Sequence, residues 1–293
     1  MGFVAIFRFL NKYLGELNHL FLILLFFLPN LFIWTSGNLK ESILIFGLGT
    51  LLFLIGQSLN SPNIKRYLPW TILGVLLLIF IKFYVLLALS IPLIAFIWIE
   101  KNPKTSLWIY PIVLAISLFV GFNTGSIHET IDLPKIFDLK QSDFVRLAEW
   151  QSAGSSFELS DIEPNFMGIL KVVPEGIFNC FFRPLPWNVN GAQYYPSIIE
   201  NFLILLLIGV AIFSWIKTRS FFSKSHQNII IFSILFVILL FGLVGITTPV
   251  AGALVRYKVP ALPFLLFVLI ILGKESSFLK SIELDLVKLK LFR

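Results

Sequence analysis

Charged residues are scarce in this sequence, and so are the residues that build metal and redox sites. Lysine, arginine, aspartate and glutamate make up 13% of its 293 residues, whereas they make up roughly a quarter of a soluble domain. The single cysteine, Cys180, cannot form a disulfide within the chain, and the three histidines lie too far apart for a Cys/His metal site. No P-loop or glycine-rich phosphate fingerprint occurs. A water-soluble protein is therefore excluded, and ATP-driven transport by this chain alone is disfavoured. We expect no cofactor, although the composition leaves a divalent metal open.

Long apolar runs take the place of the missing charge. Hydrophobic residues make up 57% of the chain, aromatic residues 16%, and the mean hydropathy is +0.90. The runs are about 15 to 20 residues long, enough for a helix to cross a hydrocarbon core of about 30 Å. This predicts an all-α polytopic membrane protein, a bundle of about eight transmembrane helices with a small helical extracytoplasmic cap. The predicted spans are residues 20–35, 42–58, 67–81, 84–99, 107–122, 198–216, 228–246 and 259–273.

Residues 67–99 allow two interpretations, because Lys82 is the one charged residue in this apolar stretch. The stretch is either one long tilted helix with a buried lysine or a hairpin with Lys82 at its turn. Basic residues favour the cytoplasmic ends of spans, and the basic connections lie at residues 65–66, 101–104 and 217–224. All three share one side only if residues 67–99 turn back, so we predict the hairpin, either fully crossing or re-entrant. Both termini then lie in the cytoplasm.

Composition divides the chain into four segments. We predict N-terminal transmembrane helices in residues 1–122, an extracytoplasmic cap in 123–197, C-terminal transmembrane helices in 198–273 and a cytoplasmic amphipathic tail in 274–293. The tail has leucines and isoleucine at helical spacing between charged residues, which is typical of a helix lying on the membrane surface.

The predicted cap differs from the rest of the chain in charge, with nine acids against five bases. Ser142 has the character of an N-cap, which predicts a helix over residues 143–150. The amphipathic run 165–182 contains Pro174, which we expect to split it into two short interfacial helices.

Two cations and a tyrosine, Arg256-Tyr257-Lys258, lie at the predicted outer mouth of the last span. Arginine binds phosphate with paired donors, and each cation near a membrane surface attracts anionic headgroups by about 1 kcal/mol. Ordinary snorkelling at the interface gives the same pattern. Because the cations lie on the side that the positive-inside tendency disfavours, we favour a binding role.

Three more charged residues have two interpretations each. Lys82 is either a functional ionisable group in apolar surroundings or the solvated tip of a hairpin. Glu41, at the start of a span, is either a catalytic base or a complement to the helix dipole. Arg183, in the run Phe182-Arg-Pro-Leu-Pro-Trp187, is either a phosphate ligand or part of a rigid turn.

Two motifs point to a family: Pro29-Asn-Leu-Phe-Ile-Trp-Thr-Ser-Gly37 leading to Lys40-Glu41, and Arg256-Tyr257 followed by Pro260 and Pro263. Together they resemble the later part of bacterial polytopic glycosyltransferases of the GT-C type, which use polyprenyl-phosphate-linked sugars. The resemblance implies an extracytoplasmic site at the helix mouths, with Arg256 and Lys258 on the lipid phosphate and Glu41 nearby. The turn at 182–187, before Glu200-Asn201, is similar to one in membrane proteins of bacterial polysaccharide gene clusters.

One departure from that family concerns its catalytic acid, which generally lies in the first outer loop. Here that loop is residues 36–40, ending at Glu41 itself. The chain looks like a family member that lacks its N-terminal spans.

The sequence therefore predicts a bacterial inner-membrane glycosyltransferase, or a related protein of polysaccharide assembly. Glu41 would accept a proton from the acceptor hydroxyl, while the cations Arg256, Lys258, Arg183 and Lys82, with Tyr257, would hold the departing phosphate. The alternative is a non-enzymatic membrane protein, either a transporter of lipid-linked glycan or an accessory subunit. Expected partners are membrane lipid, the polyprenyl-phosphate-linked sugar and other membrane proteins. The scattered basic residues argue against nucleic acid.

Overall fold

The computed structural model describes residues 1–37, 39–60, 64–126, 128–187, 189, 191–218 and 222–288. Within these ranges the regular structure is helical, apart from an isolated antiparallel bridge between Ser156 and Val250. The α-helices are α1 (Gly2–Leu14), α2 (Asn18–Phe27), α3 (Pro29–Ser36), α4 (Lys40–Asn60), α5 (Leu68–Lys101), α6 (Ile109–Phe122), α7 (Leu133–Trp150), α8 (Phe166–Phe182), α9 (Tyr195–Thr218), α10 (Lys224–Thr247), α11 (Ala251–Lys258), α12 (Leu262–Leu272) and α13 (Ser277–Lys288). The predicted all-α class is confirmed.

Among the described residues, five helices are long and apolar enough to cross a membrane: α4, α5, α9, α10 and the continuous stretch Ala251–Leu272 that contains α11 and α12. The pair α2 and α3 meets the same criteria as one unit, bent by 55°, and would make a sixth. α6 is apolar but has only 14 residues. The prediction of a helical membrane protein is therefore confirmed, whereas the count of about eight spans is not reached on these criteria.

The helix α5 is interrupted at Lys82, where the backbone leaves the helical region (φ −152°, ψ 84°). The arm before Lys82 packs along α4, with Gly74 against Leu51 and Lys82 against Glu41. Because residue numbers rise along α5 as they fall along α4, this arm runs antiparallel to α4.

The arm of α5 after Lys82 returns in the opposite direction. The ring of Phe96 lies 5.9 Å from that of Phe9, and Phe9 packs on Gly56 near the far end of α4. A helix that continued straight past Lys82 would put Phe96 about 21 Å beyond that turn. The contacts therefore make α5 a helical hairpin with Lys82 at its turn.

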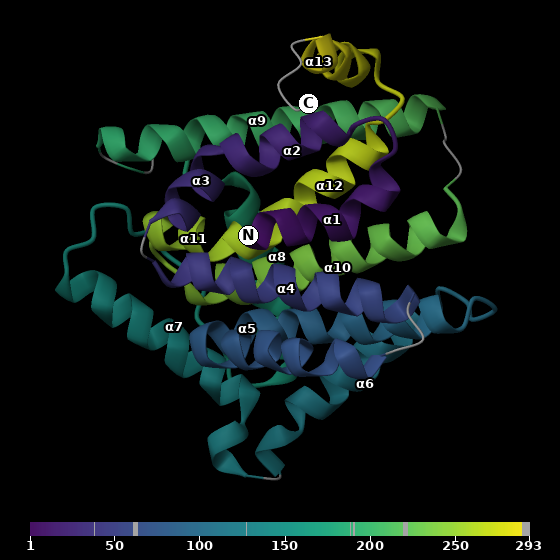
Figure 1. The fold of residues 1–293 in the computed structure, drawn as a ribbon. Helices are drawn as coiled ribbons and strands as arrows, with labels where there is room; N and C mark the ends of the chain where they lie inside the picture. Colours follow the sequence, from purple (N-terminus) through teal and green to yellow (C-terminus); the bar gives the residue numbers. More distant parts are fainter. Residues whose placement is uncertain are drawn as a thin grey trace.

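The hairpin gives the bundle two chemically different ends (Figure 1). The basic connections around residues 65–66, 101–104 and 224 lie together at one end, where the ammonium of Lys224 bonds to the carbonyl of Pro103. We call this the basic end. The opposite end, which holds Glu41, Lys82 and Arg256, is the cluster end.

The first helix, α1, is a core element that the sequence analysis left unassigned. Its residues Ile6, Phe9 and Leu10 are buried, and a Cβ at Gly49 of α4 would come within 2.2 Å of the carbonyl oxygen of Gly2. The two helices thus pack backbone to backbone through glycine, a contact that only small residues permit.

Two helix boundaries predicted for residues 123–197 are wrong. α7 begins at Leu133, where Asp132 caps it by accepting a bond from the Lys135 amide at 3.4 Å, so Ser142 lies inside the helix. α8 continues through Pro174 without splitting. Its close packing on α10, through Gly176 and Gly245, holds the helix together on both sides of the proline.

The tail forms α13, which docks on α2 through Glu283. Glu283 is buried; its carboxylate lies 2.7 Å from Nδ1 of His19 and accepts a hydrogen bond of 2.7 Å from the Leu20 amide. The backbone N–H of His19 also donates to this carboxylate, at 3.1 Å, so Glu283 satisfies two free N–H groups at the start of α2. The predicted amphipathic helix is present over residues 277–288, while residues 289–293 lie outside the described ranges.

The crossing of α8 and α10 gives a first test. A Cβ at Gly245 would lie 1.9 Å from the carbonyl oxygen of Gly176, so Gly245→Ala must push the helices apart. We expect it to cost about 1–3 kcal/mol of stability. The buried thiol of Cys180 on α8 bonds to the Phe241 carbonyl at 3.3 Å, so its reaction with a fluorogenic maleimide reports the thermal unfolding of detergent-purified protein.

The matched control is Gly209→Ala on α9, because no atom lies within 4 Å of a Cβ built there. This change should leave the midpoint unchanged or raise it, since alanine is the better helix former. Equal midpoints for the two variants would contradict the proposed crossing.

Candidate functional site

A buried carboxylate holds two cations together at the cluster end. The side chain of Glu41 is fully buried, and its Oε1 lies 2.8 Å from Nζ of Lys82 and 2.6 Å from Nε of Arg256. Arg256 also donates a hydrogen bond of 2.7 Å from its Nη2 to Oε2 of Glu41. Arg256 therefore holds the carboxylate through one charge-assisted hydrogen bond and a second close ionic contact.

Local structure brings these three residues together from distant parts of the chain. Glu41 lies in the first turn of α4, where a negative charge complements the helix dipole. Lys82 lies at the turn of the α5 hairpin, and Arg256 in the last turn of α11. Three of the six predicted site residues thus form one cluster, and the hairpin is what places Lys82 in it.

Aromatic rings enclose the cations. Nζ of Lys82 lies 4.1 Å from the ring centre of Tyr257, and the guanidinium of Arg256 lies 5.5 Å from that of Trp34. Tyr257 in turn makes edge contacts with Tyr84 and with Phe144 of α7. Ring faces attract cations, so Tyr257, also a predicted site residue, helps to fix Lys82 in place.

The cluster carries a net positive charge, because one carboxylate faces two cations. The side chain of Lys82 is only 9% exposed, whereas that of Arg256 is 30% exposed. Arg256 is therefore the member that a ligand can reach. A single anionic group bound there would neutralise the remaining charge.

The ammonium of Lys258 is buried beside the cluster and bonds to backbone and side-chain oxygens of neighbouring helices; we call these contacts the framework. It is 1% exposed and donates to the carbonyls of Cys180 at 3.2 Å and Arg183 at 3.3 Å, and to Oδ1 of Asn201 at 2.8 Å. An ammonium has three hydrogens, and three acceptors occupy them. Lys258 thus ties the end of α11 to α8 and α9.

Arg183 lies next to this framework rather than in the cluster. Its Nε donates to Oδ1 of Asn179 at 2.8 Å, and its guanidinium lies 4.0 Å from the ring centre of Phe157. Lys258 connects it to α11 through the Arg183 carbonyl. The six predicted residues therefore divide into the cluster with Tyr257, and a framework made by Lys258 and Arg183.

A second buried carboxylate, Glu200, had no role in the sequence analysis. It is fully buried, and its Oε2 accepts a bond of 2.6 Å from the Asn30 amide at the start of α3. Ser197 donates to the Asn30 side chain at 2.7 Å. The helix is interrupted between α2 and α3, just before Pro29, so the first N–H groups of α3 have no partner within the helix. Glu200 accepts a hydrogen bond from one of them. The sequence pattern that could have predicted this buried polar group is the spacing of Ser197, Glu200 and Asn201, which share one face of an apolar helix.

An apolar groove of about 250 Å³ lies between the second arm of α5 and the helices α6, α7, α8 and α10. Ala88 lines the groove and lies one helical turn after Tyr84 in the second arm of α5. Phe137 of α7 also lines it, about 10 Å along that helix from Phe144. Tyr84 and Phe144 both contact Tyr257, so α5 and α7 each carry residues of the groove and a ring near Lys82.

The surroundings of Glu41 limit its chemistry. A carboxylate shielded from water and paired with two cations is a poor proton acceptor, because protonation would leave both cations without a partner. The same pairing fixes Lys82 and Arg256 in position. The geometry thus suits Glu41 better as a holder of cations than as a base.

Among the described residues, no group of three or more His, Cys, Asp or Glu side chains could hold a metal ion. No protein-family model, curated protein or solved structure matched the chain in the comparisons.

Removing the charge of Glu41 tests the cluster. Glu41→Gln leaves Lys82 and Arg256 unpaired in low-polarity surroundings, and breaking a buried pair in this way costs about 3–5 kcal/mol. We expect a large loss of folded protein, measured by size exclusion and thermal unfolding in detergent.

The double variant Glu41→Gln/Lys82→Met should recover much of that loss, because it removes the most buried unpaired cation. If the effects of the two changes simply added, the pair would not be coupled and the cluster as described would be wrong.

Proposed function

We propose that this protein binds the phosphate of a polyprenyl-phosphate-linked sugar at the cluster end. The observation that carries the proposal is the net positive cluster, with Arg256 accessible and held in place by a buried glutamate. Arginine recognises phosphate with paired donors, and Lys82 adds a second positive charge behind it. Binding would require little rearrangement, because Glu41 already fixes both cations.

The apolar groove supports a lipid-linked substrate over a soluble one. Its lining is nearly all hydrocarbon and aromatic side chains, and Ala88 in this lining lies one helical turn from Tyr84. A prenyl chain in this groove would bring its phosphate to the rings of Tyr84 and Tyr257. Burial of the chain would contribute about 0.8 kcal/mol per methylene transferred from water.

For catalysis, we propose transfer of the sugar to an acceptor hydroxyl on the extracytoplasmic face of a bacterial inner membrane, as in GT-C-type glycosyltransferases. The acceptor oxygen would bond to the sugar carbon as the bond from that carbon to the phosphate oxygen breaks. Arg256 and Lys82 would stabilise the charge on the leaving phosphate. The hydroxyl proton would pass to Glu41, the carboxylate of the cluster.

One observation favours a non-enzymatic role instead. Glu41 is the carboxylate of the cluster, and both of its oxygens are engaged by cations. A transporter or an accessory subunit would need the phosphate site without a free base. Release of polyprenyl phosphate from the sugar donor in the presence of acceptor separates the two roles, because only the transferase gives it.

Arg256→Ala tests the binding site. The change leaves Glu41 paired with Lys82 alone, so the buried charges still balance and the protein should fold. Binding of a labelled polyprenyl-phosphate sugar to the detergent-purified protein should weaken by about a hundredfold, since bonds to charged groups contribute roughly 1.5–3 kcal/mol each.

The matched control is Arg146→Ala on α7, which removes an exposed arginine paired with Asp143 at 2.8 Å. It should bind like wild type. Unchanged binding by Arg256→Ala, with normal thermal unfolding, would overturn the proposed site.

The proposed orientation has its own test, which uses cysteines placed at exposed serines of the two ends, Ser36→Cys and Ser106→Cys. Burial raises the pKa of the native Cys180 thiol to about 12, so it should stay unreactive in the folded protein. A membrane-impermeant maleimide added to spheroplasts should label the cysteine at position 36 and spare the one at 106. The reverse result would place the basic end outside.

A further inference from the structure

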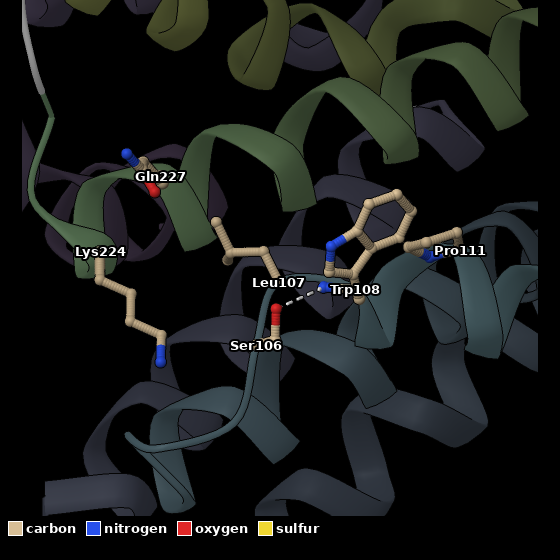
Figure 2. A pocket seen from close by; sticks show the side chains of 6 residues that line it. All are labelled: Ser106, Leu107, Trp108, Pro111, Lys224 and Gln227. Atoms are coloured by element: carbon tan, nitrogen blue, oxygen red, sulfur yellow. Dashed lines mark hydrogen bonds between the residues drawn. The ribbon is translucent and has the colours of Figure 1, made fainter.

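A hollow of about 720 Å³ opens at the basic end, far from the cluster. Its lining comes from the start of α6 with the segment before it, and from the first turn of α10: Ser106, Leu107, Trp108, Pro111, Lys224 and Gln227. Figure 2 shows Lys224 extending from α10 toward the segment that carries Ser106.

Hydrogen bonds fix the walls of this hollow. Lys224 donates to the Pro103 carbonyl, and the hydroxyl of Tyr110 on α6 donates to Oδ1 of Asn228 on α10 at 2.7 Å. Asn228 also donates to Glu100 at 2.9 Å. Glu100 is thus bonded to Asn228, which is not part of the lining, and protein contacts set the spacing between α6 and α10.

The lining is suited to an anion. It has an ammonium at Lys224, an amide at Gln227, a hydroxyl at Ser106 and an indole N–H at Trp108, but no carboxylate. Lys101 and Lys104, both exposed, precede Ser106 in the chain. Phosphate oxygens would find several donors and a positive field here.

The neighbouring face of α6 indicates that the anion carries hydrocarbon chains. Trp108 is 75% exposed, and Ile112, Ile116 and Phe119 continue from it along the helix as exposed apolar side chains. Tryptophan is enriched at the headgroup level of membranes. Side chains spaced by three or four residues form one stripe on a helix, so an apolar stripe leads directly away from the hollow.

We infer that this hollow binds the phosphate-bearing headgroup of an anionic phospholipid, whose chains lie along the stripe of α6. A soluble phosphate compound would use the same donors but would leave the stripe unused. The site is independent of the substrate site proposed above, because it lies at the other end of the bundle and shares no residue with it.

Native mass spectrometry of the purified full-length chain with added phosphatidylglycerol or phosphatidylcholine tests the inference. Wild type should retain the anionic lipid preferentially. Lys224→Gln should weaken phosphatidylglycerol binding about fivefold, the effect of one cation near a membrane surface, and should leave phosphatidylcholine binding unchanged. Trp108→Ala should weaken the binding of both lipids.

The matched control is Lys217→Gln, which removes an exposed lysine from the end of α9, across the bundle from α6 in Figure 1. Equal affinities for the two lipids, or an equal loss in Lys217→Gln and Lys224→Gln, would overturn the site. Displacement of phosphatidylglycerol by millimolar inorganic phosphate would also overturn it, because the ligand would then be the free anion. Lys224 and Trp108 are exposed, so unchanged thermal unfolding should accompany both variants.

Discussion

The cluster end of this protein depends on one buried carboxylate between two cations. Glu41 has no contact with solvent, so the cost of burying its charge is offset mainly by Lys82 and Arg256. Loss of Glu41 would leave both cations unpaired, whereas loss of Arg256 would leave the carboxylate paired with Lys82. The start of α4, the turn of the α5 hairpin and the end of α11 are therefore held in one arrangement. Any ligand that binds Arg256 meets a guanidinium whose position is already fixed, which lowers the entropy cost of binding.

Broken helices explain why so many polar residues are buried at this end. The chain departs from helical geometry at Lys82, between α2 and α3 at Pro29, and between α10 and α11. Each break frees backbone groups, which are tolerated at membrane depth only where the protein itself supplies partners. Glu200 supplies one for the start of α3, and Lys258 supplies partners for two backbone carbonyls at the end of α8, those of Cys180 and Arg183. The polar network and the breaks therefore form one structural unit around the site.

The sequence predicted correctly those features that hydropathy and the positions of charged residues decide. The all-α class followed from hydropathy, and the α5 hairpin from the position of Lys82 relative to three basic connections. It failed where packing decides. Pro174 stays within α8 because Gly176 lets that helix press on α10, and α1 is buried because its glycine meets Gly49. The sequence identified residues of the site but not their contacts. Nothing in the sequence around Lys258 indicates that its ammonium bonds to α8 and α9, whereas Arg256, two residues earlier, remains accessible.

The two proposed lipid sites differ in the physical setting of their charges. Lys82 is nearly buried and Arg256 partly so, with Glu41 and aromatic rings close by, so salt screens their attraction for an anion only weakly. Lys224, Lys101 and Lys104 are exposed to solvent, where the Debye length at physiological salt is about 8 Å. Rising ionic strength should therefore release the phospholipid from the basic end well before it weakens the substrate at the cluster end. That order follows from burial alone: the charges of the basic end are exposed to solvent, whereas those of the cluster end are shielded by the protein.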